Sequence, residues 1–274
     1  MNSSFRNSHQ DIETASHVPE TPQTRSPAYR LAFTDQEFMC RPELRPVRLQ
    51  LELLKPEMAL DEANVESTVV LFGGARVPSP GSDRGVPALA KYYEQARRFA
   101  YLITKESMET GGTQNVVTTG GGPGVMEAGN LGAHEAGGRS IGLNIVLPHE
   151  QAPNTYITPE LAFNFHYFAI RKMHFLMRAS AISVFPGGFG TMDELFETLT
   201  LIQTGRMEQV PVLLFGEEFW RDVVNWDALS RAGTISPEDL ELFRFVDTAE
   251  DAIEAMRNWE GAGTRRGEIP GRQT

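Results

Sequence analysis

The sequence predicts an α/β fold in which a mainly parallel sheet is covered by helices on both faces. Short apolar segments alternate with amphipathic helical segments through residues 66–260. The apolar segments have the composition of buried strands, and three of the turns that follow strands are rich in glycine. Alternation of buried strands with helices is typical of a parallel sheet between two helical layers.

The elements follow in chain order. Residues 67–72 are predicted to form an apolar first strand that ends in Gly73 and Gly74. These two glycines are candidate substrate-binding residues, because first strands of nucleotide-binding sheets commonly end in glycines. A helix then presents Leu89, Tyr93, Ala96, Ala100 and Ile103 on one face, at helical spacing. The further predicted strands cover residues 115–119, 140–146, 181–185, 210–215 and 243–246. A further predicted helix begins after Gly124, and the others lie near residues 168–179, 191–204, 217–230 and 249–259.

The ends of the chain differ from this central region. A chain of 274 residues with 41% hydrophobic residues can bury one substantial core. Residues 1–30 and 261–274 lack apolar periodicity and are predicted to be flexible tails. Residues 31–65 are predicted to be an N-terminal helical extension, whose apolar stripe contains Leu44, Val47, Leu51, Leu54 and Met58.

Composition excludes several classes of function. A net charge of −11 argues against binding of a nucleic acid polymer. The single cysteine, Cys40, allows no intramolecular disulfide, thiolate zinc site or iron–sulfur site, so we expect a reducing, cytoplasmic location. No run approaches the roughly twenty apolar residues of a membrane span, and the N-terminus is unlike a secretory signal. The six histidines include no His-Glu-x-x-His pattern, so no catalytic metal is expected.

The glycine-rich segment at residues 186–194 is the sharpest functional signal. It follows an apolar strand and opens an amphipathic helix, where free N–H groups and the helix dipole favour an anion. Gly187, Gly188 and Gly190 would let the backbone approach a phosphate closely, and Thr191 could add its hydroxyl. The alternative is that these glycines serve only a tight turn between strand and helix.

A second glycine-rich turn, at residues 120–124, follows another strand and opens another helix. Gly121 and Gly122 with Glu127 would serve ribose binding, or the segment is a simple helix cap. Neither turn has the spacing of a Walker loop or of a Gly-x-Gly-x-x-Gly dinucleotide site, which counts against ATPase and dehydrogenase activity.

A polar stripe on the predicted helix at residues 168–179 contains Arg171, His174 and Arg178. Such a stripe is ordinarily a solvated face. However, this helix precedes the strand that leads to residue 186, so its start could lie near the site, where a guanidinium can hold a phosphate bidentately.

Taken together, Gly120-Gly-Gly-Pro-Gly-Val-Met-Glu127, Arg171-Lys172 and Pro186-Gly-Gly-Phe-Gly-Thr-Met-Asp-Glu194 resemble the LOG family of cytokinin riboside 5′-monophosphate phosphoribohydrolases. Members were formerly labelled lysine decarboxylases. The resemblance covers roughly residues 69–257, and the segment from residue 144 is similar to the longer bacterial branch. It implies a Rossmann-like three-layer fold and hydrolysis of the N-glycosidic bond of an adenosine 5′-monophosphate, N6-modified or plain, to free base and ribose 5-phosphate.

The resemblance also implies roles for particular residues. Glu194 would stabilise an oxocarbenium-like ribose or activate water, and Arg171 would orient the nucleotide or assist departure of the base. Lys172 would support the phosphate or ribose, and nothing suggests that it forms an imine with a cofactor. Asp193 is a weaker candidate than Glu194. Adjacent helical residues point about 100° apart, so only one of the two acids should line the site, and the sequence alone does not settle which. The resemblance implies no cofactor. It also implies that the protein forms a homodimer or a larger homo-oligomer.

Two other functions fit the same residues. One is a nucleosidase that accepts nucleoside 5′-monophosphates with many bases. The other is a non-catalytic nucleotide sensor, which would use the glycine-rich turn for binding and the N-terminal segment for partners.

Overall fold

The computed structural model describes residues 6–82, 85–148 and 152–259. The chain divides into two compact units, of which the first ends at Glu52 and the second begins at Leu53. The predicted tail at residues 261–274 lies outside the described residues. None of the described helices is both long and apolar enough to cross a membrane.

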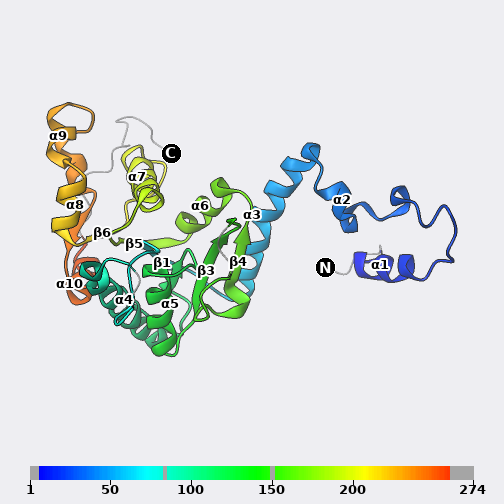
Figure 1. The fold of residues 1–274 in the computed structure, drawn as a ribbon, viewed down its shortest axis with the longest axis horizontal. Coiled ribbons are helices and arrows are strands. Elements are labelled where there is room, and N and C mark those ends of the chain that lie inside the picture. Colours follow the sequence, from blue (N-terminus) through cyan, green and yellow to red (C-terminus); the bar gives the residue numbers. More distant parts are fainter. Residues whose placement is uncertain (1–5, 83–84, 149–151, 260–274) are drawn as a thin grey trace, which may run out of the picture. The chain divides into compact units, whose positions relative to one another are not determined.

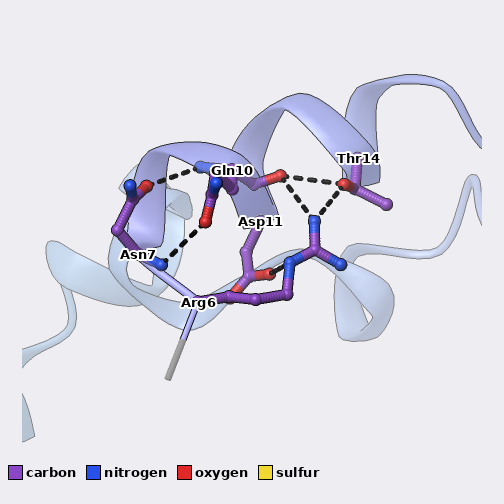
Figure 2. A network of polar contacts seen from close by, with 5 residues as sticks. All are labelled: Arg6, Asn7, Gln10, Asp11 and Thr14. Carbon is purple, nitrogen blue, oxygen red and sulfur yellow. Dashed lines mark hydrogen bonds and ion pairs between the residues drawn. The ribbon is translucent and has the colours of Figure 1, made fainter. Parts of the chain in front are cut away.

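Helix α1 (Ser8–Ser16) of the first unit is held by local polar contacts. The Asn7 side chain accepts from the Gln10 N–H at 2.9 Å, and the Gln10 side chain accepts from the Asn7 N–H at 3.1 Å. Arg6 donates to the Thr14 hydroxyl at 2.8 Å, as Figure 2 shows. The sequence patterning did not predict α1 because none of its residues is buried. The division into tail, extension and domain therefore stays a prediction.

The remaining helical segments of the first unit are short. Helix α2 covers Gln36–Met39, and the Asp35 side chain caps it by accepting from the N–H groups of two of its residues. Single 3-10 turns lie at Pro27–Tyr29, Ala32–Thr34 and Pro42–Leu44. Helix α3 (Arg45–Glu62) begins in this unit and ends in the second.

The second unit is built on a parallel sheet of seven described strands, in the order β4-β3-β2-β1-β5-β6-β7. This confirms the predicted α/β fold class. The strands are β1 (Thr68–Phe72), β2 (Val116–Thr119), β3 (Ser140–Ile145), β4 (Ala162–Phe165), β5 (Ala179–Val184), β6 (Val212–Phe215) and β7 (Arg244–Val246). The sequence analysis missed β4, an edge strand in which only alternate residues are buried.

Helices cover both faces of this sheet, and Figure 1 shows α4 and α5 on one side and α6 and α7 on the other. One layer contains α4 (Ala90–Glu109), α5 (Val125–Glu135) and α10 (Ala249–Arg257). The other contains the end of α3, with α6 (Phe168–Met177), α7 (Phe189–Gln203), α8 (Glu217–Val223) and α9 (Trp226–Arg231). Further 3-10 turns lie at Pro87–Leu89, Pro159–Leu161 and Pro237–Glu241.

The single helix predicted at residues 217–230 is two helices. The chain leaves helical geometry between α8 and α9, and the Asn225 side chain accepts from the Ala228 N–H to start the second helix. The apolar pattern continues through the break, because both Trp220 and Trp226 are buried in the same core.

Alternation along β1 explains how one strand serves both layers. Val70 and Phe72 pack into the core under α6 and α7, whereas Val69 and Leu71 pack into the core under α4 and α5. The strand order reverses at β1, because the chain winds from β1 out to β4 and then returns to place β5 on the other side of β1. Ligands of such sheets bind at this reversal, beyond the carboxyl ends of the strands.

Candidate functional site

Three glycine-rich turns meet at the reversal point. The Gly74 N–H, after β1, donates to the Pro186 carbonyl oxygen, after β5, at 3.0 Å. The Val125 N–H, at the start of α5, donates to the Gly74 carbonyl oxygen at 3.3 Å. A Cβ at Gly73 would come within 2.6 Å of the Val125 side chain, so the turns pack directly against one another. The sequence predicted each turn separately, and the fold places them together.

Glycine is required at some positions of these turns but not at others. Gly121 has a φ of 77°, and a Cβ there would collide with the Asn144 amide. A Cβ at Gly187 would collide with the Thr191 hydroxyl. By contrast, no described atom lies within 4 Å of a Cβ at Gly188 or Gly190. The turn before α7 therefore has open space beside its backbone.

Arg171, on α6, is fixed at the centre of this region. Its side chain is only 10% exposed, and its Nε donates to the Leu143 carbonyl oxygen in β3 at 2.6 Å. The guanidinium lies over the Phe175 ring, 5.0 Å from its centroid. A Cβ at Gly120 would come within 2.6 Å of Arg171 Nη2, so glycine at residue 120 makes room for the guanidinium.

Glu194, on α7, faces Arg171. Its carboxylate oxygen Oε1 lies 3.8 Å from Arg171 Nη1, and its side chain is 15% exposed. Burial raises the pKa of Glu194 to about 7, the positive charge of Arg171 opposes this increase, and the nearby Asp193 carboxylate adds to it. A carboxyl group with a pKa near neutrality can take up and release a proton at working pH.

The neighbouring carboxyl group of Asp193 points elsewhere. Lys172 Nζ lies 2.8 Å from the Asp193 carboxylate and 3.1 Å from that of Glu197, and Asp193 is 57% exposed. Burial lowers the pKa of Lys172, but the hydrogen bonds to both carboxylates outweigh it and leave the pKa above its ordinary value. The structure thus separates the two adjacent acids: Glu194 faces the buried arginine, and Asp193 faces the lysine.

The rest of the polar stripe on α6 joins that helix to α3. Arg178 lies 3.0 Å from the Glu57 carboxylate and donates to the Val65 carbonyl oxygen at 2.6 Å. His174 is buried, with its Nδ1 3.5 Å from Glu57. The stripe is therefore not a solvated face. Of its three residues, Arg171 is the one that the structure places near Glu194 and the glycine-rich turns.

Glu127 lies in the first turn of α5, as the sequence indicated, and accepts a hydrogen bond from the Tyr93 hydroxyl at 2.9 Å. Burial and this bond raise the pKa of Tyr93. The sequence analysis assigned Tyr93 only to an apolar helix face. It also missed Asn154, whose backbone N–H donates to the Gly121 carbonyl oxygen at 2.8 Å. An isolated asparagine in a loop carries no motif, so no sequence signal marked it.

The fold and these contacts define a class: a parallel α/β protein whose glycine-rich turns meet at its topological reversal, with a buried arginine beside an acid of raised pKa. A family model described as "Possible lysine decarboxylase" matches residues 126–256. The cytokinin riboside 5′-monophosphate phosphoribohydrolase LOG3 of Arabidopsis thaliana is 25% identical over 148 residues, which cover 53% of this chain. A probable enzyme of the same description, LOGL5 of Oryza sativa subsp. japonica, is 29% identical over 143 residues, or 51% of this chain.

The match spans 67% of the length of the Arabidopsis relative and 56% of the rice relative. The resemblance to the LOG family predicted from the sequence is confirmed by these matches. Two solved structures are also similar: the molybdenum cofactor binding protein of Rippkaea orientalis, with 19% identity and a TM-score of 0.48, and the Moco carrier protein of Chlamydomonas reinhardtii, with 19% identity and a TM-score of 0.45. Each comparison covers 70% of this chain and 96% of the other.

Proposed function

We propose that this chain hydrolyses the N-glycosidic bond of an adenosine-type nucleoside 5′-monophosphate, N6-modified or plain, and releases the free base and ribose 5-phosphate. The observation that carries the proposal is the buried Arg171 beside Glu194, whose carboxyl group has a pKa of about 7. Its sequence relatives named as phosphoribohydrolases support the same chemistry.

In this proposal the phosphate binds at the start of α7. That helix has 15 residues, so the positive end of its dipole and its first free N–H groups favour an anion. The open space beside Gly188 and Gly190 leaves room for phosphate oxygens close to the backbone. The Thr191 hydroxyl, which packs against Gly187, supplies a further donor.

The Arg171–Glu194 pair then performs the hydrolysis. As the bond from C1′ to the base nitrogen breaks, positive charge develops on the ribose, and the ionised Glu194 carboxylate stabilises it. A water molecule forms the new C1′–O bond and gives its proton to Glu194. The electron pair of the broken bond leaves with the base, next to the Arg171 guanidinium, and the base then takes up the proton.

Chromatography of products tests the proposal. The purified chain is incubated with AMP, isopentenyladenosine monophosphate, GMP and CMP, and free base and ribose 5-phosphate are quantified. Release from the adenosine-type nucleotides supports the proposal, and comparable turnover of all four would favour the broad nucleosidase. Nucleotide binding without release of base would instead support the sensor.

The raised pKa of Glu194 predicts the pH dependence of the reaction. The mechanism uses the ionised carboxylate, so kcat/KM should increase as pH rises through about 7 and level off above it. Steady-state rates between pH 5 and 9 measure this. Because the substrate phosphate also titrates near pH 6, the Glu194→Gln variant is the control and should lose the inflection near 7. An unchanged inflection in that variant would assign it to another group.

The homo-oligomer expected from the sequence stays a prediction. Large apolar side chains on α6 and α7 are exposed, among them Met173, Met177, Phe196 and Phe189, which is 96% exposed. Exposed apolar side chains that gather on neighbouring helices are typical of surfaces that a second chain covers. Light scattering of the purified chain should give a mass of at least twice 30.4 kDa, and a monomeric mass would refute the expectation.

A further inference from the structure

The carbonyl groups of the turn at residues 120–124 are held on one side by a single asparagine. The Asn154 N–H donates to the Gly121 carbonyl oxygen at 2.8 Å. The Asn154 Nδ2 lies 3.1 Å from the same oxygen and 3.1 Å from the Gly122 carbonyl oxygen. Two consecutive carbonyl groups therefore point toward Asn154.

Asn154 is itself fixed by a polar network. Its Nδ2 donates to Oδ1 of Asn130 at 2.9 Å, and its Oδ1 accepts from the Tyr156 N–H at 3.2 Å. Asn130 is fully buried on α5, and its Oδ1 also accepts from the Thr119 hydroxyl at 2.7 Å. That hydroxyl accepts from the Gly121 N–H at 3.0 Å, which closes a ring of hydrogen bonds through the turn. Such a hydrogen-bonded network, whose members Thr119 and Asn130 are buried, allows the turn few alternative conformations.

The geometry of the peptide bond gives the direction of the next donor. In a trans peptide the N–H points opposite to the C=O of the preceding residue, so the Gly122 N–H points away from Asn154. Asn154 lies on the α5 side of the turn, because it bonds Asn130. Arg171 Nη2 approaches Gly120 from the α6 side. The Gly122 N–H is therefore directed toward the side of Arg171, and no described residue accepts a hydrogen bond from it.

We propose that Asn154 is a positioning residue that directs the Gly122 N–H toward a ribose hydroxyl of the bound nucleotide. The inference rests on the proposed function. Ribose lies between the phosphate and the base of a 5′-mononucleotide. The turn likewise lies against Arg171 at Gly120 and is joined through Val125 and Gly74 to the turn that precedes α7. A single neutral N–H matches an uncharged hydroxyl oxygen, whereas the start of α7 offers several donors and a dipole for the phosphate.

The test compares, for each of three nucleotides, the dissociation constant of the protein with Asn154 and that of the Asn154→Ala variant. In the Glu194→Gln background, which conserves the ligand, dissociation constants are measured for AMP, 2′-deoxyAMP and 3′-deoxyAMP with Asn154 and with Asn154→Ala. The asparagine-to-alanine change should weaken AMP binding by about fivefold to tenfold, the value of one hydrogen bond. One of the two deoxy analogues lacks the hydroxyl to which the Gly122 N–H would donate. For that analogue, the change to alanine should weaken binding by less than about twofold. An alanine at residue 154 that merely loosens the fold cannot produce this dependence on one ligand hydroxyl.

Two further variants make the result decisive. If Asn154→Ala does not fold, Asn154→Asp keeps the shape of the side chain, which can no longer donate. Its charge acts equally on all three nucleotides, so the difference between them still reports the hydroxyl. Thr248→Ala removes the cap of α10, the helix that follows β7, and β7 lies four strand positions from β2. This variant should leave all three dissociation constants unchanged. The Asn154 variants could instead weaken the binding of all three nucleotides equally, or leave it unchanged. Either result would overturn this inference but not the proposed function. Failure of the parent protein to bind AMP would overturn the proposed function and this inference with it.

Discussion

Replacing Glu194 with glutamine should lower kcat for hydrolysis of an adenosine-type monophosphate at least about a hundredfold, and should keep the dissociation constant within about tenfold. The amide has the shape of the carboxyl group but can neither take a proton from water nor stabilise positive charge on the ribose. Single-turnover release of base and equilibrium binding of AMP separate the two effects. Near-normal turnover in the variant would remove Glu194 from the mechanism.

The stability of the same variant distinguishes lost chemistry from lost fold. Because the folded-state pKa of Glu194 lies near 7, above its ordinary value of 4.5, ionisation of this carboxyl opposes folding. Its contribution to stability decreases as pH rises from about 4.5 to 7. The Glu194→Gln variant should therefore unfold at no lower temperature than the parent at pH 8. A matched control is Asp193→Asn, at the exposed acid paired with Lys172, which should keep kcat within about threefold.

The fold could be predicted because its signals are local. A buried strand such as β1 is apolar along its whole length, and α4 carries its apolar residues at helical spacing, so each element could be identified from its own residues. β4 could not, because it pairs on one side only and buries alternate residues over four positions. The break between α8 and α9 was missed because apolar residues continue across it into one core.

The candidate site was predictable only in part, because its geometry depends on contacts between distant residues. The turns at residues 120–124 and 186–190 and the pair Arg171 and Glu194 lie in segments with recognisable patterns. Which of the adjacent acids faces the arginine depends on how α7 is rotated against α6, and the structure shows this through Lys172, which pairs with Asp193. The bond from Arg171 to the Leu143 carbonyl oxygen joins residues 28 positions apart, and no local pattern encodes it.

Burial also separates residues that look alike in sequence. Arg171 and Arg178 lie seven positions apart on the polar stripe, so they face nearly the same direction. Arg178 meets Glu57 and the Val65 carbonyl oxygen beside α3, and these contacts hold α6 in place. Arg171 donates to the Leu143 carbonyl oxygen, and its Nη1 lies 3.8 Å from the Glu194 carboxylate. Arg171 therefore lies beside the acid of raised pKa, whereas Arg178 lies beside α3.

This difference leads to the second large effect expected. Replacing Arg171 with methionine should lower kcat/KM at least about a hundredfold, the usual cost of losing a donor aimed at developing charge. The same variant should move the pH inflection of kcat/KM above 7, because the Arg171 charge is what opposes the effect of burial on the pKa of Glu194. Arg171→Lys keeps the charge, so its inflection should stay near 7, although it loses the planar fork and most of the activity.

Arg178→Met is the matched control for these measurements, because it removes a second part-buried arginine from the same stripe. It should lower the unfolding temperature, since Glu57 loses its partner, and should leave the pH inflection in place. A shift of the inflection in Arg178→Met as large as that in Arg171→Met would contradict the assignment, because the pKa of Glu194 would then follow the position of α6 and not the charge beside it. A shift confined to the Arg171→Met variant would identify the guanidinium and the carboxyl group as one electrostatically coupled unit.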